Sequence, residues 1–302
     1  MKRQPRTDLA VEARELWEQA AEKTTELPGV KARDSVAHGY PLTTVEIIDD
    51  EGSKALNKPR GTYHTLTLEG FRQHTDDAFE RAVNAISDQL RPMLQVDEGA
   101  LILVAGLGNS AITPDALGPR AAQNVMVTRH LVERSPQDFG AFRPVAAVAP
   151  GVLGTTGVES FEIVRSVAEK IKPATVIAVD ALASMSPARV CTTVQISDTG
   201  ISPGSGVGNN REALDQATLG VPVIAVGIPT VVDAATLAIE LDKSAGLRNV
   251  DEDELRKAAG DMIVTPRTID NDIVDLSRLV GYALNIALQK NLTINDVTMF
   301  LS

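Results

Sequence analysis

Short apolar runs alternate with amphipathic segments along the chain from residue 101 onwards. The runs are 101–105, 145–148, 174–179, 192–196 and 221–226. Segments with helical periodicity lie between or after them, at about 114–134, 158–171 and 266–291. Such alternation is typical of a parallel sheet covered by helices on both faces. We therefore predict an α/β fold whose central sheet is mostly parallel.

The first hundred residues follow another pattern. An apolar stripe predicts a helix over 8–27, which Pro28 and Gly29 end. Residues 42–49 and 62–68 alternate between apolar and polar positions, which predicts an antiparallel pair of strands. A second amphipathic helix is expected over 75–94. These elements predict an N-terminal, β-containing extension of the α/β core.

Composition excludes several classes of protein. The 302 residues carry a net charge of −11, 3% aromatic residues, one cysteine and four histidines. A disulfide framework is therefore excluded, and a Cys- or His-rich metal site is not expected. The acidic charge argues against direct binding to nucleic acid. No apolar run reaches the roughly 20 residues of a membrane span or follows the basic N-terminus as in a signal peptide. We expect a soluble protein of the cell interior.

Glycine-rich loops follow the apolar runs, where ligands bind in parallel sheets. We expect their backbone N–H groups to face a ligand or a developing oxyanion. The candidate residues are Gly106, Gly108, Asn109, Gly151, Gly154, Gly204 and Gly206. Gly106 and Gly108 partly match a dinucleotide fingerprint, but Ala111 stands at the third glycine position. A non-enzymatic module that binds a nucleotide or phosphate therefore stays as an alternative.

Two aspartates stand at the ends of predicted strands or the starts of helices. Thr113, Pro114 and Asp115 are typical of a helix start with Thr113 as the N-cap, where Asp115 complements the helix dipole. Asp180 ends an apolar run, where a carboxylate is costly to bury and its pKa tends to rise. Both residues have capping interpretations. Together they also suit a base and acid pair that activates water for peptide hydrolysis without a metal.

Other candidate catalytic residues have simpler structural interpretations. Ser205 lies between two glycines but outside a G-x-S-x-G elbow, so we expect it to form a turn. Cys191 begins a β-rich run and is expected in the core. His130 lies on a predicted helix and is expected to be structural.

Several long blocks of sequence resemble the germination protease family of spore-forming bacteria. They are VAGLGNSAITPDALGP (104–119), VTRH (127–130), APGVLGTTGVE (149–159), KPATVIAVDALA (172–183), TTVQISDTGISPGSGVGNNR (192–211), LGVPVIAVGIPTVVDA (219–234) and IVTPRTID (263–270), with RTDLAVEA (6–13) near the start. The likeness covers most of residues 100–234. The stretch between Ala235 and Met262 is shorter than in family members, which leaves surface or assembly features open.

The resemblance implies a fold, an activity and an assembly. The fold is like that of hydrogenase maturation peptidases, and the activity is that of an aspartic-type endopeptidase without a cofactor. Its catalytic residues fall on Asp115 and Asp180. The family forms homotetramers in the forespore or spore core, where it begins the degradation of small acid-soluble spore proteins. Because hydrogenase maturation peptidases bind nickel at acidic and His positions, a metal-dependent peptidase that uses the same aspartates stays as an alternative.

The resemblance also implies a self-processing zymogen. Family substrates are cut after an acidic residue and before a hydrophobic residue followed by Ala, a pattern matched by Asp8, Leu9 and Ala10. Residues 1–8 would be a propeptide cut between Asp8 and Leu9, with an ordinary frayed terminus as the alternative. Residues 9–302 would be one peptidase domain. Its parts would be an N-terminal extension (9–99), a catalytic core (100–240) and a helical C-terminal segment (241–302).

Overall fold

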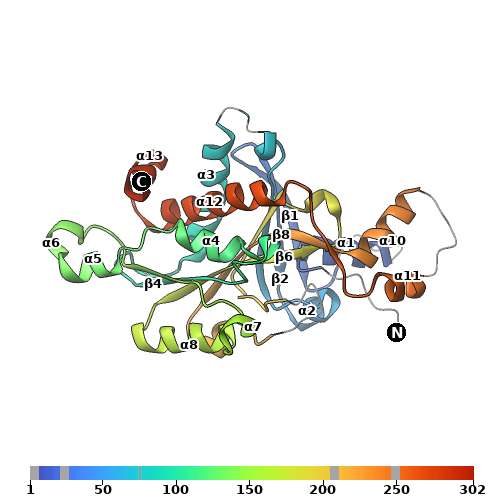
Figure 1. The fold of residues 1–302 in the computed structure, drawn as a ribbon, viewed down its shortest axis with the longest axis horizontal. Coiled ribbons are helices and arrows are strands. Elements are labelled where there is room, and N and C mark those ends of the chain that lie inside the picture. The colour runs from blue at the N-terminus through green and yellow to red at the C-terminus, as the bar shows by residue number, and fades with distance from the viewer. Residues whose placement is uncertain (1–6, 21–26, 74, 76, 205–210, 246–251) are drawn as a thin grey trace.

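The computed structural model of this chain contains a single sheet with helices on both faces (Figure 1). The structure describes residues 7–20, 27–73, 75, 77–204, 211–245 and 252–302, and the counts below refer to these residues. The nine strands are β1 (Val30–Ala37), β2 (Tyr40–Ile47), β3 (Gly61–Thr67), β4 (Ile102–Gly106), β5 (Val145–Val148), β6 (Thr175–Ser184), β7 (Thr193–Ser197), β8 (Val223–Asp233) and β9 (Ile263–Val264). Eight of them follow the order β1-β2-β3-β7-β8-β6-β4-β5, and β9 pairs with β8.

Helices and short 3₁₀ turns connect these strands. The α-helices are α1 (Ala10–Ala20), α2 (Asp50–Leu56), α3 (Ala78–Met93), α4 (Leu117–Gln123), α5 (Arg129–Arg134), α6 (Pro136–Phe139), α7 (Leu153–Thr156), α8 (Ser160–Ile171), α9 (Gln216–Leu219), α10 (Ala234–Ala245), α11 (Glu252–Ala259), α12 (Ile269–Leu288) and α13 (Ile294–Leu301). The 3₁₀ turns are η1 (Phe71–Gln73), η2 (Thr113–Asp115) and η3 (Pro187–Arg189).

Four strands form the parallel part of the sheet, in the order β5, β4, β6 and β8. The apolar runs of β4, β6 and β8 are buried on both faces, as expected for strands that helices cover from both sides, whereas the edge strand β5 is only partly buried. On one face lie α3, α4 and α12, and on the other lies α8 (Figure 1). The α/β fold class predicted from the sequence is therefore confirmed.

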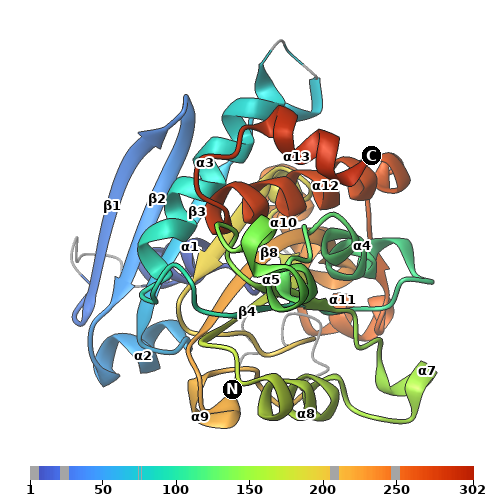
Figure 2. The ribbon, with the colours of Figure 1, turned by 90° about the vertical axis from the view of Figure 1, so that its left-hand side faces the viewer.

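The other part of the sheet is antiparallel and carries the N-terminal extension. Strands β1, β2, β3 and β7 pair antiparallel in that order, and β7 also pairs antiparallel with β8. Figure 2 shows β1 and β2 at the edge of the molecule. The predicted pair 42–49 and 62–68 corresponds to β2 and β3, so the β-containing extension is confirmed.

Two strands differ from the prediction for physical reasons. The run 192–196 was expected in the parallel set, but β7 is antiparallel to β8. A short connection through η3, rather than a crossover helix, joins β6 to β7 and reverses the chain. Strand β1 was not predicted, because it lies at the sheet edge and its side chains are mostly exposed, which leaves no apolar alternation.

The helical segment predicted over 114–134 is broken into η2, α4 and α5. Thr113 is not the N-cap, since it lies inside η2, and Ile112 stands at the cap position without a side-chain cap bond. The break allows close packing of α4 on the sheet. A Cβ at Gly118 would lie 2.4 Å from the carbonyl oxygen of Val179 on β6, so only glycine fits there. The predicted helix 8–27 is α1, with 21–26 outside the described residues.

Candidate active site

Asp180 lies in the middle of β6 and not at its end, because the strand continues to Ser184. Its side chain is 4% exposed, and its Oδ1 accepts a hydrogen bond of 2.9 Å from the backbone N of Ala181. Burial raises the pKa of Asp180 well above its ordinary value, and the nearby carboxylates of Asp115 and Asp8 raise it further. The surroundings of Asp180 therefore favour its protonated form.

Asp115 is held at the end of η2 by the loop that follows β4. Its Oδ2 accepts a hydrogen bond of 2.9 Å from the backbone N of Asn109. Gly108 adopts a φ of +115°, and a Cβ there would lie 2.1 Å from the carbonyl oxygen of Asp115. Burial raises the pKa of Asp115, while the Asn109 hydrogen bond and the Arg211 charge oppose that rise. Asp115 is only partly buried, so it faces a site open to solvent.

The two aspartates lie near each other in the fold, and their catalytic role stays a prediction. The backbone N of Leu107, just after β4, donates a hydrogen bond of 2.8 Å to the carbonyl oxygen of Val179, the neighbour of Asp180. The charge of Asp115 raises the pKa of Asp180, and the charge of Arg211 lowers the pKa of both carboxyl groups. Two coupled carboxyls with unequal environments are the arrangement needed for one proton shared between an acid and a base.

The N-terminal segment lies against β6 three residues beyond Asp180. The backbone N of Asp8 donates to the carbonyl oxygen of Ala183 at 3.0 Å, and the backbone N of Ala183 donates to Oδ2 of Asp8 at 2.9 Å. Leu9 and Ala10 are fully buried, and Leu9 packs on Leu182. The segment therefore lies beside the aspartate pair.

A cavity of 570 Å³ opens beside this segment. Its lining includes Asp8, Lys58, Gln195, Arg211 and Gly227. Gly227 pairs with Asp180 on one side and with Gln195 on the other, so the three residues lie in a row across β6, β8 and β7. The cavity therefore lies next to the strand position of Asp180, although neither Asp180 nor Asp115 lines it.

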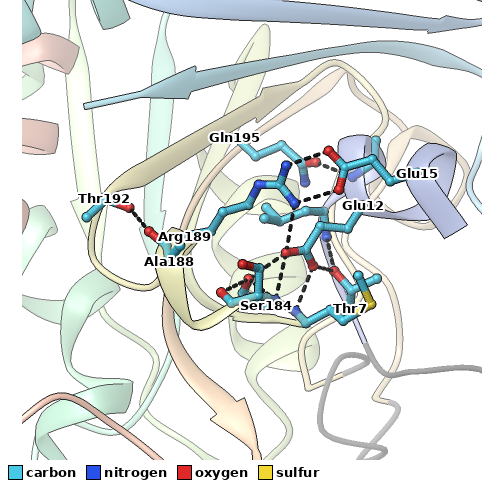
Figure 3. A network of polar contacts seen from close by, with 12 residues as sticks. Thr7, Glu12, Glu15, Ser184, Ala188, Arg189, Thr192 and Gln195 are labelled. Carbon is cyan, nitrogen blue, oxygen red and sulfur yellow. Dashed lines mark hydrogen bonds and ion pairs between the residues drawn. The ribbon is translucent and has the colours of Figure 1, made fainter. Parts of the chain in front are cut away.

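A buried carboxylate fastens α1 to the loop after β6. Glu12 is fully buried and accepts hydrogen bonds from Ser184 Oγ at 2.7 Å, Met185 N at 2.7 Å and Ser186 N at 3.0 Å. It also contacts Thr7, and Arg189 reaches both Glu12 and Glu15 of α1 (Figure 3). This network fixes the start of α1, and with it the position of residues 7–10.

The remaining predicted glycines lie in several environments. Gly106 approaches α4, where a Cβ would lie 2.2 Å from the carbonyl oxygen of Gly118. The carbonyl oxygen of Gly151 accepts a hydrogen bond of 2.7 Å from Ser160 Oγ, whereas Gly154 faces open space. Gly204 has a φ of +74°, and Gly206 lies outside the described residues. Their role as oxyanion donors stays a prediction.

The structure describes two of the three residues set aside as nucleophiles. Cys191 is fully buried with a φ of +59°, and burial raises the pKa of its thiol to about 12. His130 lies on α5, and Ser205 falls outside the described residues. In the described part of the chain, no group of three His, Cys, Asp or Glu side chains is arranged to hold a metal ion.

Sequence reasoning missed Lys58, Gln195 and Arg211, which lie around the same cavity. Gln195 left a readable signal, since it interrupts the apolar pattern of β7 and is itself buried. Lys58 follows α2 in a polar loop, where nothing in the sequence distinguishes it from a surface lysine. None of the described helices is long and apolar enough to span a bilayer.

Comparison with known proteins identifies the family of the chain. The profile of the germination protease family matches residues 10–245. The chain belongs to the germination protease family. Germination proteases of Clostridium tetani and Caldanaerobacter subterraneus subsp. tengcongensis are 41% and 42% identical to it, each over 98% of this chain and 99% and 98% of their own lengths. The chain is therefore a peptidase of a family named for spore germination.

Two further proteins are similar to parts of the chain. The germination protease of Bacillus cytotoxicus is 45% identical over 77% of this chain and 64% of its own length. Among solved structures, a NiFe hydrogenase maturation protease from Thermococcus kodakarensis KOD1 is similar with a TM-score of 0.32 and 18% identity. It covers 47% of this chain and 80% of its own. A superposition of that quality supports no argument about the site.

Proposed function

We propose that the chain is a self-processing endopeptidase of spore germination whose catalytic pair is Asp115 and Asp180. The observation that carries this proposal is the position of residues 8–10. They lie beside the carboxyl pair, with the Asp8 carboxylate bound to Ala183 and Ala10 fully buried. An acidic, then a hydrophobic, then a small residue thus occupy neighbouring positions at the site. The segment behaves as a bound substrate whose cleaved bond joins Asp8 to Leu9.

The environments of the two aspartates suggest their roles. Asp180 is buried whereas Asp115 is only partly buried, so we assign the shared proton to Asp180. Asp115 is ionised and accepts a proton from the attacking water as general base. Asp180 donates its proton to the departing nitrogen of Leu9 as general acid. The products are the carboxylate of Asp8 and the amine of Leu9.

The substrates, assembly and location of the protein follow from the same proposal. Small acid-soluble spore proteins with an acidic–hydrophobic–Ala sequence would bind where residues 8–10 lie. The enzyme would be a homotetramer in the cytoplasm of the forespore or the spore core. Residues 1–8 would be the propeptide, and 9–302 the peptidase domain with boundaries near 99 and 240. Sedimentation velocity of the purified chain tests the tetramer.

The experiment that tests the activity is intact-mass analysis of the purified chain during incubation. Wild type is expected to lose residues 1–8 and gain an N-terminus at Leu9. Asp115→Asn and Asp180→Asn keep the fold but lose processing by at least the roughly 10²- to 10⁴-fold that general acid–base groups contribute. Asp138→Asn, at an exposed position on α6, is the matched control. Processing at the wild-type rate in either active-site variant contradicts the assignment.

Chelation distinguishes the proposed mechanism from that of a metal-dependent peptidase that uses the same two carboxylates. The proposal expects processing to continue after exhaustive treatment with EDTA, with the same new terminus at Leu9. Loss of processing on chelation, followed by recovery on addition of a divalent metal, would favour the metallopeptidase instead.

A further inference from the structure

The carbonyl oxygen of Asp8 lies between two side-chain donors from distant parts of the chain. Lys58 Nζ donates to it at 2.7 Å, and Gln195 Nε2 donates to it at 3.1 Å. This carbonyl belongs to the peptide bond between Asp8 and Leu9. Both donors thus point at the atom that would carry negative charge if water attacked that bond.

Lys58 is an unusual residue to find in this position. Its ammonium is buried, and this burial lowers its pKa, while the charges of Asp8 and Glu12 raise it again. A buried ammonium is costly unless it faces negative charge. In the resting structure its hydrogen-bond acceptor here is a neutral carbonyl oxygen. The cost is better offset when that oxygen becomes an anion, since the interaction then joins two opposite charges in a medium of low dielectric.

The backbone around Lys58 is fixed by the end of α2. Asn57 is the C-cap in the left-handed region, with a φ of +51°. Ser53 Oγ donates to the carbonyl oxygen of Lys58 at 2.7 Å, and the backbone N of Lys58 donates to the carbonyl oxygen of Ser53 at 3.2 Å. The ammonium is thus presented from a fixed turn and needs little reorganisation during a reaction.

Gln195 is oriented by the segment that it binds. Its Oε1 accepts a hydrogen bond of 2.7 Å from the backbone N of Ala10, so its Nε2 faces the carbonyl oxygen of Asp8. Because Gln195, Gly227 and Asp180 lie in one row across the sheet, their side-chain positions share one face. The Gln195 amide and the Asp180 carboxyl group therefore flank the same peptide segment, and Gly227, which lacks a side chain, lies between them.

We propose that Lys58 and Gln195 are catalytic residues that bind the oxyanion formed on the carbonyl of the cleaved bond. This inference rests on the proposed function. As the water oxygen bonds to the carbonyl carbon, the carbonyl electron pair moves to oxygen and is stabilised by the two donors. When the carbonyl re-forms, the bond to nitrogen breaks and the nitrogen of Leu9 takes a proton. The oxyanion hole predicted from the glycine loops is thereby assigned to side chains.

The assignment also concerns substrates in trans. Lys58 and Gln195 contact only main-chain atoms here. Both donate to the carbonyl before the cleaved bond, and Gln195 also accepts from the N–H two residues further on. Any peptide bound in the same register presents these atoms whatever its side chains. Lys58 and Gln195 thus serve hydrolysis in general, whereas Ala183 contacts the acidic side chain.

The test uses the full chain and the variants Lys58→Met and Gln195→Met, with Lys54→Met as matched control. Lys54 is exposed on α2, the helix that precedes Lys58. Two rates are measured, the appearance of the Leu9 terminus by intact mass and the cleavage of a peptide with a Glu-Leu-Ala sequence. Each active-site variant is expected to lose roughly 10²- to 10³-fold in the first-order rate and in kcat. Lys58→Arg should recover part of the loss, because it restores a cationic donor.

The outcomes separate this inference from the proposed function. If Lys58→Met processes at the rate of Lys54→Met, or raises only KM, the lysine is a tether and the inference is wrong. If Lys58→Met melts at a much lower temperature, its rates do not separate catalysis from folding. The same two rates measured on Gln195→Met then decide between an oxyanion donor and a tether. If wild type itself never cleaves between Asp8 and Leu9 or in the peptide, the proposed function fails.

Discussion

Asp8 and Ala183 exchange two hydrogen bonds, one from each backbone N, with the Asp8 carboxylate as acceptor of the second. The pair resembles one step of a β-ladder in which a side chain replaces one carbonyl. It places the acidic residue of the N-terminal segment three residues from Asp180 along β6. A backbone N–H of β6 therefore binds the acidic side chain that precedes the proposed cleavage site.

Replacing this acidic side chain should slow self-processing. Asp8→Ala removes a charged acceptor from Ala183 N, a loss worth about 1.5–3 kcal/mol, or roughly 10- to 150-fold in rate. Intact-mass analysis measures the rate of removal of residues 1–8, and Asp138→Ala on α6 serves as the control. Processing of Asp8→Ala at the control rate would remove the role of Ala183 in recognition.

The small residue at position 10 is required by space. Ala10 is fully buried, so Ala10→Leu forces extra methylene groups into a filled site at a cost of about 1–3 kcal/mol. We expect slower self-processing but unchanged or faster cleavage of an added peptide, because the intramolecular segment no longer fits. Ala141→Leu, at an exposed site, should change neither rate. Equal slowing of both reactions would point instead to general misfolding.

Activity and stability should both depend on the proton of Asp180. Its folded-state pKa is raised, so the stability that it contributes is present at low pH and is lost as the pH rises through that pKa. We expect this loss of stability to be absent in Asp180→Asn. Denaturant unfolding at several pH values measures the free energy of unfolding of both proteins. The profile of kcat/KM should fall on the alkaline side as Asp180 loses its proton. On the acid side, kcat/KM should begin to fall at a pH above the usual pKa range of Asp, because the pKa of Asp115 is also raised. A flat alkaline profile would contradict Asp180 as the acid.

Glu12 should contribute strongly to stability. Glu12→Ala leaves Arg189 and four other donors without this acceptor, and loss of one partner of a buried pair costs about 3–5 kcal/mol. Urea unfolding checks this. Glu133→Ala, which breaks the exposed ion pair with Arg129, should cost no more than about 1 kcal/mol. Similar midpoints for the two variants would show that the buried network adds little.

Gly108 should be essential for the position of Asp115. In Gly108→Ala, a Cβ strains a backbone with a φ of +115° and meets the carbonyl oxygen of Asp115. We expect roughly 1–3 kcal/mol of destabilisation and a larger loss in cleavage rate than the stability alone explains. Gly154→Ala faces open space and is the control. Wild-type cleavage by Gly108→Ala would show that the loop tolerates movement.

The sequence predicts the parallel half of the sheet and the aspartate pair because both depend on local patterns. Continuous apolar runs identify β4, β5, β6 and β8, and glycine loops mark the edge where ligands bind. The position of Asp180 inside β6 was not predicted, since Ala181 to Ser184 continue a strand whose pairing with β8 is not visible locally.

The other side of the site could not be predicted from the sequence. Lys58 and Gln195 meet at the carbonyl oxygen of Asp8 only because β7 runs antiparallel between β3 and β8 and places the N-terminal extension beside β6. The pairing of β3 with β7 joins residues more than a hundred positions apart, and no local pattern predicts it. Edge strand β1 was missed for the opposite reason, since exposure on both faces leaves it without periodicity.

The burial of Leu9 and Ala10 has a kinetic consequence. Under the proposed function, residues 8–10 are a segment tethered at its own binding site, with an effective concentration of at least the millimolar range whatever the concentration of the protein. Processing within one chain is then first order and indifferent to dilution. An added protein substrate, by contrast, competes with a ligand that cannot diffuse away. The first turn of α1 thus sets how readily the site is open to other chains.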